Sequence, residues 1–224
     1  MKYFEKHQPK NLAQIAFAEP FVKQELMDYA TGIATNHILL YGEYGTGKTT
    51  IAVALATQRL SCGEPCVLNA KSGQKLDVSM CRNQVNLSLM LGLTPIVIID
   101  EIDRFSASAQ DEIACFADEM KNYDGMLIFT TNFINKVDMA LASRCSQYHI
   151  KCLTPVQALP TAKDIMLAEG VAYQSDDWLL QQLELAVPVT SVSADWRRYG
   201  QVIDRIIRHS PKANRKPPPK LKAV

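Results

Sequence analysis

The segment from residue 37 to residue 61 constrains the fold of this chain more than any other. A strand-like run, His37–Tyr41, leads into Gly42-Glu43-Tyr44-Gly45-Thr46-Gly47-Lys48-Thr49, and a helical pattern follows. The eight residues fit G-x-x-x-x-G-K-[ST] in full, between a strand and a helix as that motif requires. Its glycines let successive backbone N–H groups face one phosphate, and the helix N-terminus adds positive potential. The segment therefore predicts an α/β fold with a phosphate-binding loop.

The residue types in this loop suit a nucleoside triphosphate with its metal ion. We expect Lys48 to reach the β- and γ-phosphates and the Thr49 hydroxyl to hold Mg²⁺. A glycine-rich turn with a chance lysine is the alternative, but it does not account for eight fitting positions. The residues expected to surround ATP are Gly42, Glu43, Tyr44, Gly45, Thr46, Gly47, Lys48, Thr49 and Thr50.

Strand-like runs alternate with helical patterns up to residue 151, which favours βαβ units around a parallel sheet. The run Ile96–Ile99 is apolar without alternation, as expected of a central strand covered on both faces. The expected helices span 20–31, 48–61, 80–91, 106–121 and 136–143. The expected strands are His37–Tyr41, Pro65–Leu68, Pro95–Ile99, Met126–Thr130 and Gln147–Lys151.

Two acidic residues, Asp100 and Glu101, follow the central strand directly. Because parallel strands end at one edge of a sheet, Asp100 is expected to act on the Mg²⁺ held by the loop. Glu101, one residue further on, is expected to activate the attacking water. Capping of the next helix is the alternative role. A second acid beside the first favours hydrolysis over binding alone, and we interpret the chain as an ATPase that uses ATP and Mg²⁺.

The pattern changes after residue 153. Residues 154–209 hold three helical patterns, near 160–169, 175–186 and 194–209, with Ser175 and either Ser193 or Asp195 as caps. This predicts a small helical domain after an α/β domain of residues 1–153. Residues 210–224 hold five basic residues and no acidic one, together with four prolines, and are expected to be disordered.

Charge and apolar patterning exclude several classes of protein. The net charge is +1, so without the +5 of residues 210–224 the remainder has 19 basic and 23 acidic residues, or −4. A uniformly basic nucleic-acid binder is excluded, although a local basic footprint is not, and the tail either attracts DNA or is simply solvated. No apolar stretch reaches 18 residues and no signal sequence is recognisable, so a cytoplasmic protein is expected. Cys62 and Cys66 could supply two metal ligands, but no second close pair accompanies them.

Several motifs between residue 3 and about residue 209 resemble AAA+ ATPases of the clamp-loader branch, namely replication factor C small subunits and the clamp loader of T4-like phages. Lys6–Leu12 is similar to the K-Y-R-P-x-x-L of that family, with Gln8 at the arginine position. Val67–Ser72 is similar to L-N-A-S-D, Asp100–Asp103 matches D-E-x-D, and Phe129–Asn132 matches the sensor-1 strand. The resemblance implies a P-loop AAA+ fold, with a five-stranded parallel sheet, flanking helices and an all-helical lid domain.

The resemblance also implies roles for individual residues. Ser143-Arg144-Cys145 is similar to the family motif S-R-C, whose arginine reaches the γ-phosphate bound by the neighbouring subunit. Asn132 would contact that phosphate or orient the water, Arg197 would be sensor 2 on the third lid helix, and Asn69 would restrain Glu101 until DNA is bound. A surface ion pair for Arg144 and a solvated, arginine-rich helix face for Arg197 are the alternatives.

Clamp loaders track the DNA backbone with residues at the starts of helices after the second and third strands. Small hydroxyls and basic side chains there suit phosphate contact without sequence reading, and ordinary loop polarity is the alternative for each. The matching positions are Lys71, Ser72, Gln74, Lys75, Arg82, Arg104, Ser106 and Ser108.

These features together predict a DNA-stimulated AAA+ ATPase of clamp-loader type. It would assemble head to tail as a homo- or hetero-oligomer on double-stranded or primer–template DNA, with a sliding clamp as partner, in phage or plasmid replication within a bacterial cytoplasm. Family members carry a helical collar domain after the lid, and residues 210–224 leave no room for one. Two alternatives therefore stay open. One is a collarless filament or ring in transposition or helicase loading, with a transposase or helicase as partner, and the other is a nucleotide-dependent interaction switch that needs no DNA.

Overall fold

The chain folds into two compact units, which are described separately. The computed structural model describes residues 6–60, 66–69 and 78–210. One unit comprises residues 9–13 and 19–151, and the other comprises the described residues among 1–8, 14–18 and 152–224. The predicted boundary between residues 153 and 154 stays a prediction, and the basic tail lies outside the described residues. No helix in the described ranges is long and apolar enough to cross a membrane.

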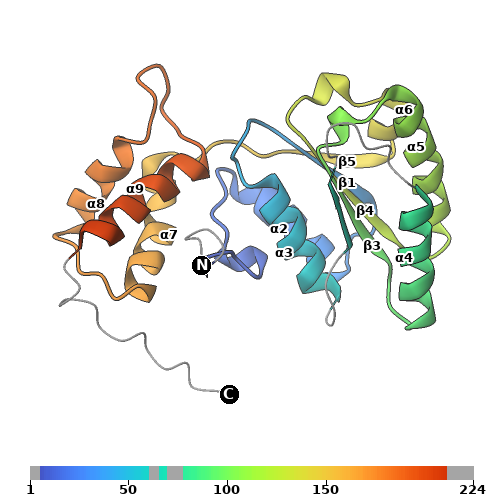
Figure 1. Cartoon of the computed structure of the whole chain (residues 1–224), viewed down its shortest axis with the longest axis horizontal. Coiled ribbons are helices and arrows are strands. Elements are labelled where there is room, and N and C mark those ends of the chain that lie inside the picture. Colours follow the sequence, from blue (N-terminus) through green and yellow to red (C-terminus); the bar gives the residue numbers. More distant parts are fainter. Residues whose placement is uncertain (1–5, 61–65, 70–77, 211–224) are drawn as a thin grey trace. The chain divides into compact units, whose positions relative to one another are not determined.

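A single parallel sheet forms the centre of the first unit (Figure 1). Its strands are β1 (His37–Tyr41), β2 (Cys66–Asn69), β3 (Ile96–Asp100), β4 (Met126–Thr131) and β5 (Cys145–His149). They stand in the order β2-β3-β4-β1-β5 and all neighbouring strands pair in parallel. Leu39 of β1 and Ile99 of β3 both pair with Phe129 of β4, so these three strands end level with one another. The predicted five-stranded parallel sheet is confirmed.

Helices cover both faces of this sheet. On one face lie α2 (Pro20–Thr31) and α3 (Lys48–Leu60), and on the other lie α4 (Val78–Met90), α5 (Ala107–Lys121) and α6 (Met139–Ala142) (Figure 1). Ile98, Ile99 and Phe129 are fully buried between the two layers. The apolar run of β3 is therefore covered on both faces, as its lack of alternation predicts. Short 3₁₀ helices among the described residues are η1 (Leu12–Gln14), whose last residue falls in the other unit, η2 (Ile102–Arg104) and η3 (Ile134–Lys136).

Two predicted elements in this unit are offset by two or three residues. The fifth strand was expected at Gln147–Lys151 but spans Cys145–His149. It is an edge strand with partly exposed side chains, so apolar content does not mark where it begins. The helix expected at 136–143 is shorter because Asp138 caps α6, accepting a hydrogen bond from the Ala140 N–H at 2.7 Å. The other strands and helices of this unit lie within two residues of their predicted ranges.

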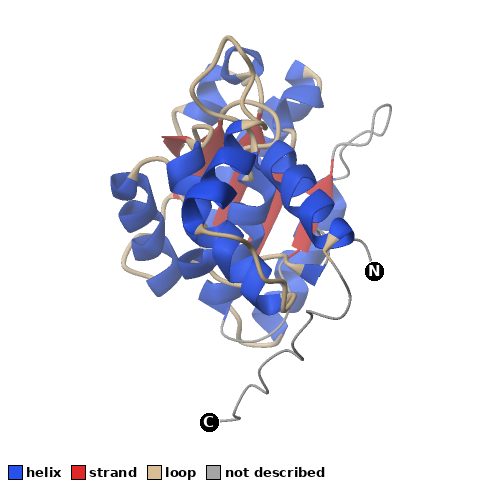
Figure 2. Cartoon of the chain, turned by 90° about the vertical axis from the view of Figure 1, so that its left-hand side faces the viewer, coloured by secondary structure: helices blue, strands red, loops and turns tan. Residues whose placement is uncertain are grey.

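The second unit contains the three predicted helices, α7 (Pro155–Ala168), α8 (Asp176–Glu184) and α9 (Trp196–His209) (Figure 2). Ser175 caps α8 and Asp195 caps α9, as predicted. Helix α7 begins five residues before its expected start at 160, because Thr154 and Gln157 form a capping box in front of Pro160. Tyr199 is fully buried in the core of this unit, and its hydroxyl donates to the Leu153 carbonyl at 2.7 Å.

Candidate nucleotide site

The loop between β1 and α3 has a backbone that only glycine adopts easily. Gly42, Gly45 and Gly47 have φ angles of 148°, 75° and 91°. A Cβ atom on Gly42 would lie 2.3 Å from the Ile150 carbonyl oxygen, whereas a Cβ on Gly47 would meet nothing within 4 Å. Gly42 is therefore required both because a side chain would not fit and because of its backbone conformation. Gly47 is required by its backbone conformation alone, since its Cα faces open space. Such a loop lets backbone N–H groups approach a phosphate closely.

Lys48 begins α3 and turns its side chain into this loop. The residue is buried, and its ammonium donates to the carbonyl oxygens of Gly42 at 2.9 Å and Glu43 at 2.6 Å. It also lies 3.4 Å from the Thr46 hydroxyl. The charge is thus held within the loop, where a phosphate bound by the backbone would be neutralised. Its contact with the β- and γ-phosphates of ATP stays a prediction.

Oxygen ligands gather beside Lys48 at the carboxyl edge of the sheet. The Thr49 hydroxyl donates to Asp100 Oδ1 at 2.7 Å, and the Thr130 hydroxyl donates to the same oxygen at 2.5 Å. A carboxylate and a hydroxyl side by side are the hard donors that Mg²⁺ prefers. Both predicted metal ligands are therefore in contact, and the donor set fits Mg²⁺ bound with ATP.

Glu101 has a strained backbone, with φ 57° and ψ 50° in the left-handed region. The Glu101 N–H donates to the Thr130 hydroxyl at 3.0 Å, which fixes the turn after β3. The Glu101 carboxylate pairs with Arg104 Nε at 2.9 Å. We expected Asn69 to restrain Glu101, but the contact that the structure describes is the one with Arg104. Asn69 pairs with Asp100 along the backbone of the sheet, and its side chain lies outside the description.

The loop after β4 is fastened to the same edge by Asp103. One carboxylate oxygen of Asp103 accepts the Thr131 hydroxyl at 2.7 Å and the Asn132 N–H at 3.3 Å. Phe133 then meets Tyr44 of the glycine-rich loop edge to face, with ring centroids 5.8 Å apart. Asn132 therefore lies at the same edge of the sheet as Asp100 and Glu101, and its contact with the γ-phosphate or the water stays a prediction.

Sequence reasoning missed two polar residues that hold this arrangement together. Thr130 links Asp100 to Glu101 through its hydroxyl, and it is buried at the end of β4. Gln110 is buried at a core position of α5, where its amide donates to the carbonyls of Phe105 and Lys136. A polar residue among the apolar core positions of a helix is the signal that could have identified Gln110.

Arg144 does not meet the glycine-rich loop of its own chain. It immediately precedes β5, and Cys145 pairs with His37 at the start of β1, whereas Tyr41 pairs with His149 at the other end. Four residues of strand separate these pairs by about 13 Å. Arg144 therefore lies at the amino edge of the sheet, and Lys48 at the carboxyl edge. Arg197 is exposed near the start of α9, in the other compact unit.

Several predicted DNA contacts have partners within the chain. Both Arg82 Nε and a terminal nitrogen of Arg82 donate to the Glu119 carboxylate, at 3.0 and 2.7 Å. Ser106 caps α5, accepting the Ala109 N–H at 3.3 Å, and Ser108 is exposed in the first turn. DNA binding by these residues stays a prediction. Lys71, Ser72, Gln74 and Lys75 lie outside the described residues.

A second metal site has no support in the described part of the chain. Among those residues, no group of three or more His, Cys, Asp or Glu side chains is placed to hold a metal ion. Cys62 and the side chain of Cys66 lie outside what is described, so that pair stays a hypothesis.

Comparison with known proteins identifies this arrangement. Residues 38–152 match the model of the ATPase family associated with various cellular activities (AAA). The chain is 29% identical to the replication factor C small subunit of Thermofilum pendens over 202 residues, 87% of this chain and 57% of the relative. It is 26% identical to replication factor C subunit 2 of Saccharomyces cerevisiae over 200 residues, 81% of this chain and 55% of the relative. The chain thus spans a little over half the length of these relatives.

Solved structures show the same fold at lower identity. A mutant form of Thermotoga maritima RuvB superposes with a TM-score of 0.64 at 18% identity, over 91% of this chain and 65% of the other. The family match covers about half of the chain, including the glycine-rich loop and the acidic pair after β3. The relatives named replication factor C support the clamp-loader branch. The chain belongs to the AAA family of ATPases.

Proposed function

We propose that this chain is a DNA-stimulated ATPase of clamp-loader type, which assembles head to tail in DNA replication and hydrolyses ATP where two subunits meet. The observation that supports the proposal is that residues predicted to form one site lie at opposite edges of the sheet. Lys48, Thr49, Asp100 and Glu101 gather at the carboxyl edge of the sheet, whereas Arg144 lies at the amino edge. Head-to-tail contact between two copies brings opposite edges together, and a single copy does not.

Each residue of the site has a chemical task in this proposal. Bound Mg²⁺–ATP supplies the phosphoryl group that is transferred to water. The loop N–H groups and Lys48 hold its phosphates, and Thr49 and Asp100 offer oxygen ligands. Glu101 takes the proton of the attacking water, and Asn132 orients that water. The Arg144 guanidinium of the adjacent subunit stabilises the charge that develops on the γ-phosphate.

The ion pair between Arg104 and Glu101 supports the role of DNA in this proposal. The pair with the Arg104 guanidinium, 2.9 Å away, occupies Oε2 of Glu101 and lowers the basicity of the carboxylate that is to activate water. A DNA phosphate that competes for Arg104 would release Glu101 for catalysis. The residue predicted to contact DNA and the residue predicted to activate water are thus in direct contact.

Arg104→Ala tests this coupling between DNA binding and ATP hydrolysis. The matched control is Lys151→Ala, which removes another exposed cation that pairs with a glutamate. We expect Arg104→Ala to raise the ATP turnover measured without DNA and to reduce its stimulation by primer–template duplex. Lys151→Ala should retain both values. Unchanged stimulation in Arg104→Ala would remove Arg104 from the coupling, and a wild-type turnover that ignores DNA would refute DNA stimulation itself.

Assembly is tested by size-exclusion chromatography with light scattering, with and without ATP and duplex DNA. Glu101→Gln should accumulate an ATP-bound oligomer, because it binds nucleotide without hydrolysing it. A monomer under every condition would contradict the proposal. An oligomer whose size and turnover are both indifferent to DNA would instead favour the interaction switch.

The cellular role follows from the relatives and is part of the same proposal. The names of the replication factor C relatives favour replication, with a sliding clamp as partner, over transposition or helicase loading. Pull-down with a sliding clamp, a transposase or a replicative helicase from the same genome distinguishes these roles. A phage- or plasmid-encoded protein in a bacterial host is the setting we propose, and the genes beside this one would test it.

A further inference from the structure

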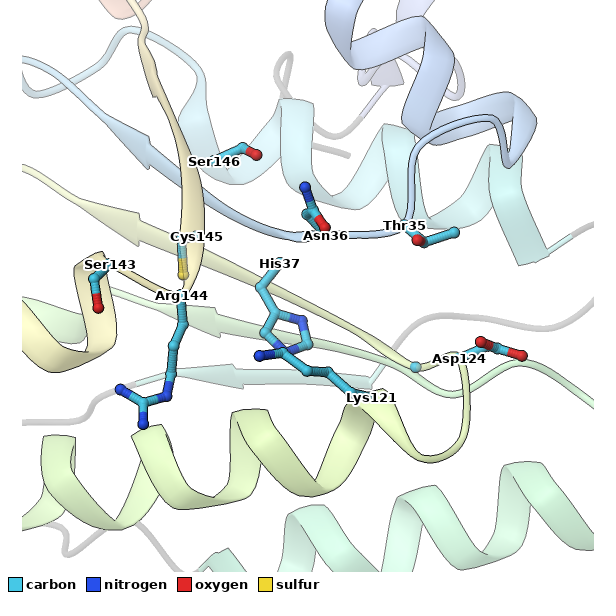
Figure 3. Close-up of a pocket in the computed structure, with 10 residues that line it drawn as sticks. Thr35, Asn36, His37, Lys121, Asp124, Ser143, Arg144, Cys145 and Ser146 are labelled. Atoms are coloured by element: carbon cyan, nitrogen blue, oxygen red, sulfur yellow. The ribbon is translucent and has the colours of Figure 1, made fainter.

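Arg144 lines a polar cavity on the amino edge of the sheet. The cavity encloses about 480 Å³ and is lined by the starts of β1 and β5 and the ends of α5 and α6. Figure 3 shows Arg144 extending from the start of β5 towards α5, with Lys121 nearby. His37 also lines this cavity, but its Nδ1 accepts the Leu127 N–H and its Nε2–H donates to the Ala117 carbonyl. Arg144 and Lys121 are the two basic side chains that line this cavity besides His37.

The guanidinium of Arg144 is held on two sides by its own chain. Nε donates to Asp118 Oδ2 on α5 at 2.9 Å, and Nη2 lies 2.8 Å from the same oxygen in the ion pair. Nη1 donates to the Ala140 carbonyl at 2.6 Å. A guanidinium has five N–H donors in a fixed plane, and these hydrogen bonds use two of them. N–H donors remain on both Nη1 and Nη2, and the two terminal nitrogens form the fork that matches two phosphate oxygens.

Asp118 is shared between Arg144 and Lys121. The Lys121 ammonium donates to Oδ1 of Asp118 at 3.1 Å, so both carboxylate oxygens accept hydrogen bonds from cations. These bonds, that of Arg144 foremost, lower the pKa of Asp118 to about 2. The carboxylate is therefore charged at neutral pH. It keeps two cations together without occupying the fork of Arg144.

We propose that Asp118 is the positioning residue of the trans-acting arginine: it fixes the Arg144 guanidinium with its terminal fork directed outwards, towards the γ-phosphate on the neighbouring subunit. This inference rests on the proposed function, because it assumes that Arg144 acts on the adjacent subunit. The physical reason is orientation. Arg144 is a flexible side chain near the surface, and the in-plane pair with Asp118 and the Ala140 bond remove most of its rotational freedom before assembly.

The positioning role is tested first by replacing Asp118 with asparagine. Asp118→Asn keeps a hydrogen-bond acceptor but loses the charge and one acceptor oxygen. We expect it to lower kcat by about 10- to 100-fold, the range in which misplaced catalytic groups act. The KM for ATP should stay within about twofold, because the other subunit's loop binds the nucleotide. Asp111→Asn, an exposed carboxylate on the same helix, is the matched control and should retain wild-type turnover.

Mixing protomers supplies a readout that a structural defect would not give. A Glu101→Gln protomer has an inactive site but an intact arginine, whereas an Asp118→Asn protomer has an intact site but a poorly placed arginine. Neither should turn over ATP well alone, and a mixture should regain turnover, because intact sites then face intact arginines. Arg144→Ala mixed with Glu101→Gln is the reference and should regain turnover in the same way.

The outcomes distinguish this inference from the proposed function. Wild-type or increased turnover in Asp118→Asn would overturn the positioning role. The role would also be overturned if mixing Asp118→Asn with Glu101→Gln fails to restore turnover while mixing Arg144→Ala with Glu101→Gln restores it. Asp118 would then act within its own chain. Failure of the Arg144→Ala mixture to recover would overturn trans action, and with it the proposed function.

Discussion

The left-handed backbone of Glu101 predicts that glycine at this position gives a more stable first unit than alanine does. Its φ of 57° costs a non-glycine residue about 1–2 kcal/mol. Glycine avoids that cost but loses about 0.5–1 kcal/mol more conformational entropy on folding than alanine does. Both Glu101→Gly and Glu101→Ala remove the pair with Arg104, so that contribution cancels between them. The difference leaves Glu101→Gly more stable than Glu101→Ala by roughly 0.5–1 kcal/mol.

Urea unfolding followed by far-UV circular dichroism measures this difference. Both tryptophans, Trp178 and Trp196, lie in the helical unit, so their fluorescence reports that unit and serves as an internal control. Both variants should lose ATP hydrolysis, and only the glycine variant should show the higher urea midpoint, at an unchanged slope. Equal midpoints, or a higher one for alanine, would refute the view that the turn after β3 stores strain at the catalytic residue.

Three further predictions concern stability and binding. Burial lowers the pKa of His37, so protons bind His37 in the unfolded chain more readily than in the folded one. The free energy of unfolding should therefore fall as pH drops below about 6.5, by at most about 1.4 kcal/mol per pH unit. Urea titrations from pH 7 to pH 5 measure this, and a free energy of unfolding that stays constant over that range would contradict it. Gly42→Ala should destabilise the fold and abolish ATP binding, because the Cβ of the alanine would lie 2.3 Å from the Ile150 carbonyl oxygen. Calorimetry measures the binding, and a wild-type affinity for ATP would refute the requirement for glycine. Tyr199→Phe leaves the Leu153 carbonyl without its 2.7 Å hydrogen bond and should lower the free energy of unfolding of the helical unit by about 1 kcal/mol. Urea unfolding followed by tryptophan fluorescence measures this loss, and an unchanged urea midpoint would count against the bond.

The features predictable from the sequence are those encoded over short distances. Gly42–Thr49 specifies its own loop because the glycines permit a backbone that other residues resist, and Lys48 follows at a fixed offset. The acids after β3 are placed by the strand that precedes them, and Asp195 caps α9 from the adjacent position. In each case the determining residues lie within one element of the residue that they place.

The features that sequence reasoning missed depend on contacts across the fold. Thr130 meets Asp100 only because β4 lies beside β3 in the sheet, although 30 residues separate them along the chain. Asp118 meets Arg144 across 26 residues because α5 packs against α6. No local pattern marks either pair, since an aspartate on an exposed helix face and a threonine in a strand are both ordinary. Edge strand β5 was misplaced for a related reason, because its neighbours decide its limits more than its own composition does.

The central claim, that hydrolysis needs two subunits, is tested most directly by ATP turnover per protomer as a function of protein concentration. A site shared between two copies should lose specific activity on dilution, as the oligomer seen by light scattering dissociates. Primer–template DNA should shift that loss to lower protein concentration, because it gathers the subunits on one strand. A specific activity that stays constant while the protein is monomeric, with and without DNA, would contradict the account.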